Sequence, residues 1–345
     1  MSNNSEDAKV DFDENDINNG ESNKDKEILS KDFIPHFLPT YRIKRNLYPI
    51  PIILVVVFAG ILAFLSSPLI PANQGYIPGG DTNPIIGLLN GLIFTGTAVI
   101  SAFVMIYFAK KKGIEVLKYI FGFSIGLLSF FLTWIFGTTI LFLIIRDEFI
   151  YRIADLILIF FSGISAIIML YRYFTSNSIF TKNFIVLYNG LLTGAIMGVV
   201  MPLWTTLAIL IGISCWDIFA VLYKKGPIKE MIDLATEARS SEIKEIEEKE
   251  KIEKGEAVYD TTKLEIGIGD LVFYSMLTSS ALIFSNNLIV MILTAIAIII
   301  GTGITISGLK RNKILPGLPI SIFLGIATML ISWGISHLLI IIFSS

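Results

Sequence analysis

Long apolar runs recur through this sequence and restrict what the chain can fold into. A helix needs about 20 consecutive apolar residues to cross the hydrocarbon core of a bilayer. We predict that nine runs each form one membrane-spanning helix: residues 48–70, 85–108, 119–145, 153–171, 184–200, 205–223, 265–284, 288–309 and 315–343. The fifth and sixth runs are continuous, and we divide them at Pro202 because proline disfavours an unbroken helix. The predicted fold class is an all-α polytopic membrane protein with nine transmembrane helices.

Charged residues are concentrated in two segments. The chain has 27 Lys and Arg and 29 Asp and Glu, of which 17 lie in residues 1–47 and 21 in residues 224–265. We therefore predict a disordered cytoplasmic tail, six helices, a charged cytoplasmic linker and three further helices, at residues 1–45, 46–223, 224–262 and 263–345. The net charge of −2 gives no sign of nucleic-acid binding.

The distribution of Lys and Arg predicts the orientation, because cationic connections stay on the cytoplasmic side of a membrane. With the amino terminus inside, 25 of the 27 Lys and Arg fall in cytoplasmic segments, and Arg146 and Arg152 fall outside. We expect an integral membrane protein of the cell membrane with a cytoplasmic amino terminus and an extracytoplasmic carboxyl terminus.

A few ionisable residues fall within the predicted spans, where each costs about 2.5 to 3.5 kcal/mol on insertion scales. Asp155 follows Arg152 by three residues, and a same-face ion pair between them is sufficient to explain it. Glu265 lies at the cytoplasmic edge and can reach water. Asp217 and Asp270 differ, because neither has a cation within a helical turn.

The sequence predicts that Asp217 and Asp270 lie at the same depth. Each is seven residues from the nearest linker-side lysine, which is roughly 10 Å along a helix. Two carboxyl groups a few ångströms apart cannot both ionise cheaply, so such a pair shares a proton. It supplies a base to activate water and an acid for the leaving group, as in aspartic proteases. Spacing alone leaves open a proton or ion relay in a channel or transporter.

Other proteolytic chemistries are disfavoured by counting. The two histidines, His36 and His337, lie in the tail and near the outer end of the last span, so no HExxH zinc site can be built. Cys215 has no histidine at its depth and no second cysteine for a disulfide. We therefore expect no metal or other cofactor.

Glycine and proline near the acids indicate where a substrate could bind. Two glycines precede Asp270 and leave the backbone bare for another chain to approach. Two prolines open the last span and favour extended backbone, which could pair with a substrate strand. We predict substrate contacts at Gly267, Gly269, Pro316, Gly317 and Leu318. A GxxxGxxxG line is predicted to pack closely against another helix; its members are Gly190, Gly194 and Gly198.

Three segments resemble the presenilins and their relatives, the GxGD intramembrane aspartyl proteases. The segments are CWDIFAVL with KGP shortly after it, LEIGIGDLVFYS, and LPGLPISI, at residues 215–222 with 225–227, 264–275 and 315–322. The resemblance implies a presenilin-like fold with Asp217 and Asp270 as the two catalytic aspartates and residues 316–318 as the PAL motif. The sequence departs from the family at Trp216, where tyrosine is usual, and at Gly317, where PAL has alanine. Both departures affect the expected pocket width and substrate choice.

The resemblance implies an intramembrane aspartyl endoprotease whose partners are transmembrane-helix protein substrates and the lipid bilayer. A cytoplasmic linker agrees with presenilins, whereas signal peptide peptidases resemble them with the opposite topology. The short first outer connection, residues 71–83, suggests a small prokaryotic, possibly archaeal, homologue. The oligomeric state and the channel or transporter alternative stay open.

Overall fold

The computed structural model of the chain describes residues 27–29, 39–70, 75–80, 82–113, 115–176, 178–223, 257–259, 263–309 and 317–344. Most of the predicted tail and linker, and Pro316, lie outside these residues. The chain divides into two units, Met1–Phe33 with Arg239–Thr261 and Ile34–Ala238 with Thr262–Ser345. In the first unit, strands β1 (Glu27–Leu29) and β3 (Ala257–Tyr259) pair in parallel.

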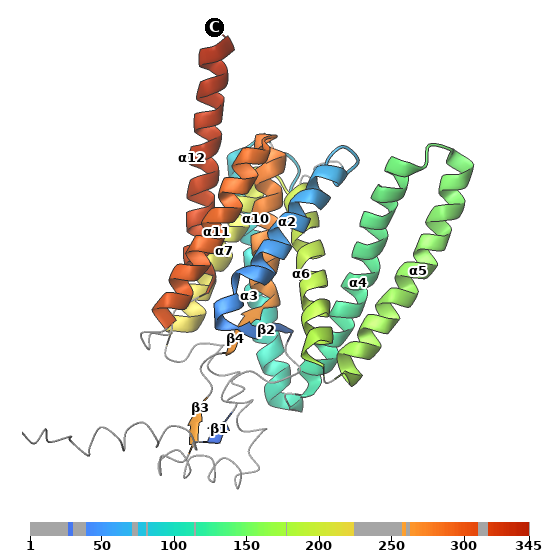
Figure 1. The fold of residues 1–345 in the computed structure, drawn as a ribbon, viewed down its shortest axis with the longest axis vertical. Coiled ribbons are helices and arrows are strands. Elements are labelled where there is room, and N and C mark those ends of the chain that lie inside the picture. Colours follow the sequence, from blue (N-terminus) through green and yellow to red (C-terminus); the bar gives the residue numbers. More distant parts are fainter. Residues whose placement is uncertain are drawn as a thin grey trace, which may run out of the picture. The chain divides into compact units, whose positions relative to one another are not determined.

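The second unit is helical (Figure 1). Within the described residues, nine helices are long and apolar enough to cross a membrane, which confirms the predicted fold class. They are α2 (Pro49–Ser66), α3 (Pro84–Lys112), α4 (Glu115–Ile144), α5 (Glu148–Thr175), α6 (Ile179–Val200), α7 (Leu203–Leu222), α10 (Ile268–Ser285), α11 (Leu288–Leu309) and α12 (Leu318–Ser344). Pro202 precedes α7 in an extended conformation (ψ 151°), so the fifth and sixth spans separate where the sequence predicted.

A two-stranded antiparallel sheet lies beside the seventh span and was not predicted. Strand β2 (Thr40–Lys44) pairs with β4 (Lys263–Gly267). The predicted tail therefore contains a strand at its end, and the seventh helix begins at Ile268 instead of Glu265. The reason is a short alternating pattern, in which Tyr41 and its cross-strand neighbour Ile266 pack on one apolar cluster.

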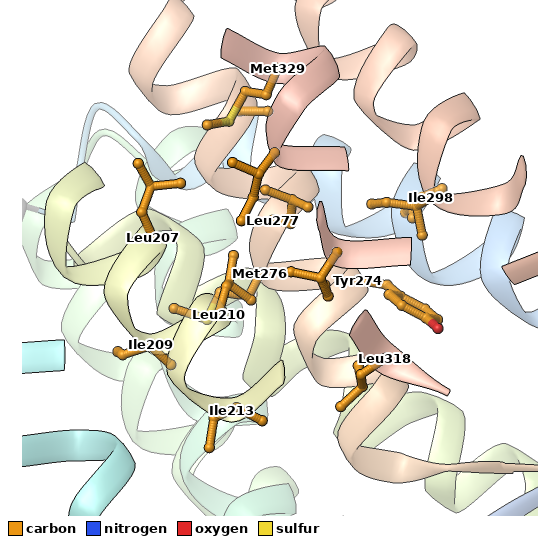
Figure 2. Packing of buried hydrophobic residues seen from close by; sticks show 14 of the residues in the cluster. Leu207, Ile209, Leu210, Ile213, Tyr274, Met276, Leu277, Ile298, Leu318 and Met329 are labelled. Atoms are coloured by element: carbon orange, nitrogen blue, oxygen red, sulfur yellow. The ribbon is translucent and has the colours of Figure 1, made fainter. Parts of the chain in front are cut away.

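Helix α10 lies at the centre of the packing. It contacts α2, α6, α7, α11 and α12, and its side chains from Tyr274 to Leu282 are buried. Figure 2 shows the largest apolar cluster, to which α7 contributes Leu210 and α12 contributes Leu318 and Met329. The helix that carries Asp270 is therefore held on several sides.

The glycine line on α6 packs against α10, which confirms the predicted close approach. A Cβ atom added at Gly194 would lie 2.2 Å from the Val272 carbonyl oxygen, and one at Gly198 would lie 2.5 Å from that of Met276. These glycines allow α6 to contact the backbone of the helix that carries Asp270.

The predicted ion pair between Arg152 and Asp155 is wrong. Arg152 contacts Glu148, one turn earlier on α5, and Asp155 accepts a hydrogen bond from the Trp134 indole Nε1 at 3.1 Å. The i,i+4 pair keeps Arg152 at the exposed helix end, while the indole satisfies the acid across the α4–α5 interface.

Candidate active site

Asp217 lies five residues before the end of α7 and faces the first residue of α12. Its Oδ2 atom accepts a hydrogen bond of 3.2 Å from the Leu318 backbone N–H and a further backbone hydrogen bond from Gly317. The first N–H groups of a helix have no partner within the helix, and they favour a nearby carboxylate. The start of α12 therefore fixes the position of Asp217.

Asp270 lies in the first turn of α10, at the third helical position. Gly267 is the N-cap residue, with φ −65° and ψ 147°, and the Asp270 carboxyl accepts a hydrogen bond from the Gly267 backbone. An acidic side chain at this position can reach back to the N-cap N–H, as in a capping box. The spacing in Gly-Ile-Gly-Asp therefore has a local structural reason: the side chain that returns to the N-cap residue lies three positions after it.

The two acids converge on residues 317 and 318. Asp217 and Asp270 are close enough for their charges to interact. The position of a Cβ atom added at Gly317 is 3.5 Å from Asp270 Oδ2, whereas the next residue donates its N–H to Asp217. Helices α7, α10 and α12 thus bring together the two predicted acids and the described part of the predicted 316–318 segment. Both aspartates are partly buried.

Leu318 makes contacts within the protein that the sequence did not predict. Its N–H donates to Asp217, and it is the first residue of α12. Its side chain is buried in the largest apolar cluster.

Among the described residues, no three His, Cys, Asp or Glu side chains gather as a metal site.

The glycines before Asp270 have few neighbours. Among the described residues, the nearest atom to a Cβ added at Gly269 is the Phe273 ring at 3.9 Å, and at Gly267 it is Asp270 itself, also at 3.9 Å. The described residues therefore leave room at both positions. This differs from Gly194 and Gly198, where a side chain would overlap α10.

A group of buried hydroxyl side chains near Asp270 was not predicted; it begins at Tyr274, one helical turn after Asp270 on α10. Tyr274 is fully buried and donates to Ser321 Oγ at 3.3 Å; Thr302 donates to the Tyr274 oxygen at 3.4 Å and lies 3.0 Å from Ser321. The group joins α10, α11 and α12. The i,i+4 spacing from Asp270 to Tyr274 is a visible signal, but the two partners come from distant parts of the chain.

Trp216 does not enter this polar group. Its ring lies edge-to-face with Phe103 of α3, with centroids 5.8 Å apart, and contacts Phe219 on its own helix. The departure from tyrosine therefore changes the α3–α7 interface beside Asp217.

The helical arrangement defines a class of membrane protein. Two solved crystal forms of a presenilin family intramembrane aspartate protease share its fold. One has a TM-score of 0.56 at 14% identity and covers 83% of this chain and 97% of that chain. The second has a TM-score of 0.52 at 13% identity and covers 82% and 96%. The chain is thus a polytopic helical membrane protein of this fold.

The sequence comparisons give the family. The presenilin family model matches residues 80–246 and 236–339, and the chain belongs to the presenilin family. It is 37% identical to Presenilin-B of Dictyostelium discoideum over 132 residues, 36% of this chain and 25% of that protein. It is 24% identical to a presenilin-like protein of Arabidopsis thaliana over 309 residues, 69% of this chain and 76% of that protein. The match therefore spans a quarter of the first relative and three quarters of the second. The resemblance carried by the three motifs is confirmed at the family level.

Proposed function

We propose that this chain is an intramembrane aspartyl endoprotease in which Asp217 and Asp270 are the catalytic pair. The observation that carries the proposal is the convergence of both carboxyl groups on the start of α12. Two interacting carboxyls that share one proton have an acid and a base ready in the same site. Membership of the presenilin family and the shared fold support the assignment.

In the proposed reaction, water lies between the two acids. The ionised carboxyl takes a proton from water as the water oxygen attacks the substrate carbonyl carbon, and the protonated carboxyl donates its proton to the carbonyl oxygen. When the C–N bond of the tetrahedral intermediate breaks, the first carboxyl gives the proton that it took to the departing amine, and the second recovers a proton from a hydroxyl of the intermediate. The Leu318 and Gly317 backbone groups hold the Asp217 carboxyl in position for this reaction. No metal enters this scheme.

The substrate is proposed to contact Gly267, Gly269, Pro316, Gly317 and Leu318, as the sequence predicted. We propose that the edge of β4 away from β2 extends this surface. Arg42 in β2 directs both of its backbone polar groups at Asn183, so Arg42 and Glu265 form a non-hydrogen-bonded pair of the ladder. The backbone groups of Glu265 then face the other edge, where the Gly267 N–H already donates to the Asp270 carboxyl. An extended peptide added at that edge would pass beside Asp270.

The proposed substrates are transmembrane helices, which must unwind locally because a helical peptide bond is shielded. We propose, as the sequence predicts, that the protein lies in the cell membrane with its amino terminus in the cytoplasm and its carboxyl terminus outside. Residues 1–45 and 224–262 would then be cytoplasmic segments. Water would then enter from the cytoplasmic side, where charged residues are concentrated.

Cleavage of a single-pass substrate by the purified full chain tests the proposal. Asp217→Asn and Asp270→Asn keep side-chain size but remove the ionisable group, so each should abolish cutting. Asp155→Asn is the matched control, because Asp155 lies on α5 and contacts Trp134, and it should cut normally. Undiminished cutting by either Asp217→Asn or Asp270→Asn would refute the pair. Ion flux in proteoliposomes that requires Asp217, without cleavage, would instead favour the channel or transporter alternative.

A further inference from the structure

Strand β2 connects the segment before the first membrane helix to the backbone that carries Asp270. The strand pairs with β4 over five residues, from Thr40 opposite Gly267 to Lys44 opposite Lys263. The Ile268 N–H, at the first position of α10, donates to the Pro39 carbonyl at 3.2 Å. The ladder therefore continues into the helix start, two residues before Asp270.

An ion pair joins the two strands at the middle of the ladder. Arg42 Nε lies 3.2 Å from Glu265 Oε1, and the two side chains are 16% and 17% exposed. The same two residues face each other in the strand register. Removing one partner of a pair at this degree of burial leaves a poorly solvated charge, so the contact resists separation of β2 from β4.

Asn183 binds the other edge of β2. Its amide oxygen accepts from the Arg42 N–H at 2.8 Å, and its amide nitrogen donates to the Arg42 carbonyl at 2.7 Å. The side chain thus replaces one residue of a third strand and occupies that edge at Arg42. Asn183 belongs to α6, whose glycines pack against α10. One helix therefore supports both the strand and the helix that flank Asp270.

The position of Asp270 needs such support. Strand β4 ends on Gly267, and one of the two residues between it and Asp270 is also a glycine, Gly269. Glycine fixes its backbone at a larger entropic cost than other residues. The described residues leave the Cβ positions of Gly267 and Gly269 without close neighbours. Side-chain packing at these two residues therefore cannot hold the acid, and the backbone ladder takes that role.

We propose that Arg42, Asn183 and Glu265 form a clamp that positions Asp270, with Arg42 and Asn183 acting as positioning residues for the reaction. The inference rests on the proposed function, since it concerns the rate of peptide hydrolysis. Tyr41, next to Arg42 in β2, anchors the strand: burial raises its pKa above the ordinary value, so the phenol stays neutral and packs with the apolar cluster around Ile266.

The test uses full-length variants with a double-mutant cycle. Arg42→Gln, Glu265→Gln and Asn183→Leu should each lower kcat by roughly 10- to 100-fold, the range expected for small misplacements of a catalytic group, with KM changed less than about twofold. The Arg42→Gln/Glu265→Gln double variant should be no slower than the slower single variant, because both act through one contact. Lys44→Gln removes a charge from an exposed position of the same strand and should retain the parental rate.

Amide hydrogen exchange separates the clamp from the proposed protease function. Asn183→Leu should speed exchange in residues 263–270 and leave the interior of α10 unchanged. Exchange equal to that of the parent in this segment would overturn the clamp, whether or not the protein cleaves peptides. Raised KM with unchanged kcat would also overturn it, because that result assigns the residues to substrate binding. Failure of the parent to cut, with exchange altered as expected, would reject the protease and keep the clamp.

Discussion

The contact between α6 and α10 gives a quantitative prediction for Gly194→Ala. The added Cβ atom would lie 2.2 Å from the Val272 carbonyl oxygen and 2.3 Å from Ser275 Cβ. Ordinary contact begins at 3.4 Å, so the first distance falls short by 1.2 Å. The nearest obstacle is backbone, which cannot rotate away as a side chain can, so the two helices must separate.

Two consequences follow from a separation of this size. Overpacking of a well-packed interface costs about 1 to 3 kcal/mol, which exceeds the gain of up to about 1 kcal/mol from replacing glycine by alanine in a helix. Asp270 would also move with α10 relative to Asp217 on α7. A misplacement of about 1 Å can cost roughly 100-fold in rate, so we expect loss of cutting to exceed loss of folded protein.

Gly96→Ala is the matched control for this experiment. It makes the same substitution in α3, where nothing among the described residues lies within 4 Å of the added Cβ. Thermal unfolding in detergent and single-turnover cleavage should therefore show a lower midpoint and a slower rate for Gly194→Ala, and neither for Gly96→Ala. If Gly194→Ala unfolds and cuts like the parent, α6 does not set the position of α10 and the packing argument is wrong.

Two further predictions concern the start of α12. Leu318→Pro should lower kcat by at least about tenfold, because it removes the N–H that donates to Asp217 and a charge-assisted hydrogen bond contributes roughly 1.5 to 3 kcal/mol. Proline is tolerated at a first helical position, and Leu318→Ala, which keeps the N–H, controls for lost packing. Equal cleavage rates for the two variants would contradict a role for this hydrogen bond. Gly317→Ala places a Cβ atom at an ordinary contact distance of 3.5 Å from Asp270 Oδ2, so cutting should persist with an altered cleavage-site preference. Mass spectrometry of the products checks this preference, and abolished cutting would count against an open pocket at Gly317.

The membrane helices could be predicted from sequence because their signal is local and long. Each apolar run is recognisable without knowledge of any partner, and Pro202 marks the one ambiguous boundary. The two acids followed from the same reasoning, since a charged residue inside an apolar run is conspicuous wherever its neighbours lie. The glycine line on α6 predicted a close contact, although the sequence did not identify α10 as the neighbour.

The sheet beside Asp270 could not be predicted in this way. Thr40 and Gly267 face each other although they are 227 positions apart, and a five-residue alternation is too short to distinguish a strand from the end of a helix. The ion pair of Arg152 shows that a local pattern can also leave the partner undecided between residues close in sequence. Spacings of three and four residues are both compatible with an ion pair, and the choice depended on Trp134, which lies on another helix.

The glycines around α10 fall into two groups with different physical causes. Gly194 and Gly198 are required by the protein itself, because a side chain there would overlap α10. Gly267, Gly269 and Gly317 are not required in that sense, since the described residues leave at least 3.5 Å at each Cβ position. All three border Asp270, and the described residues leave space around them, where we propose that a substrate backbone binds. A surface made of glycine has no side chains whose packing could fix its backbone. The hydrogen-bonded pairing of β4 with β2, and of β2 with Asn183, therefore supplies the support for Asp270 that we propose.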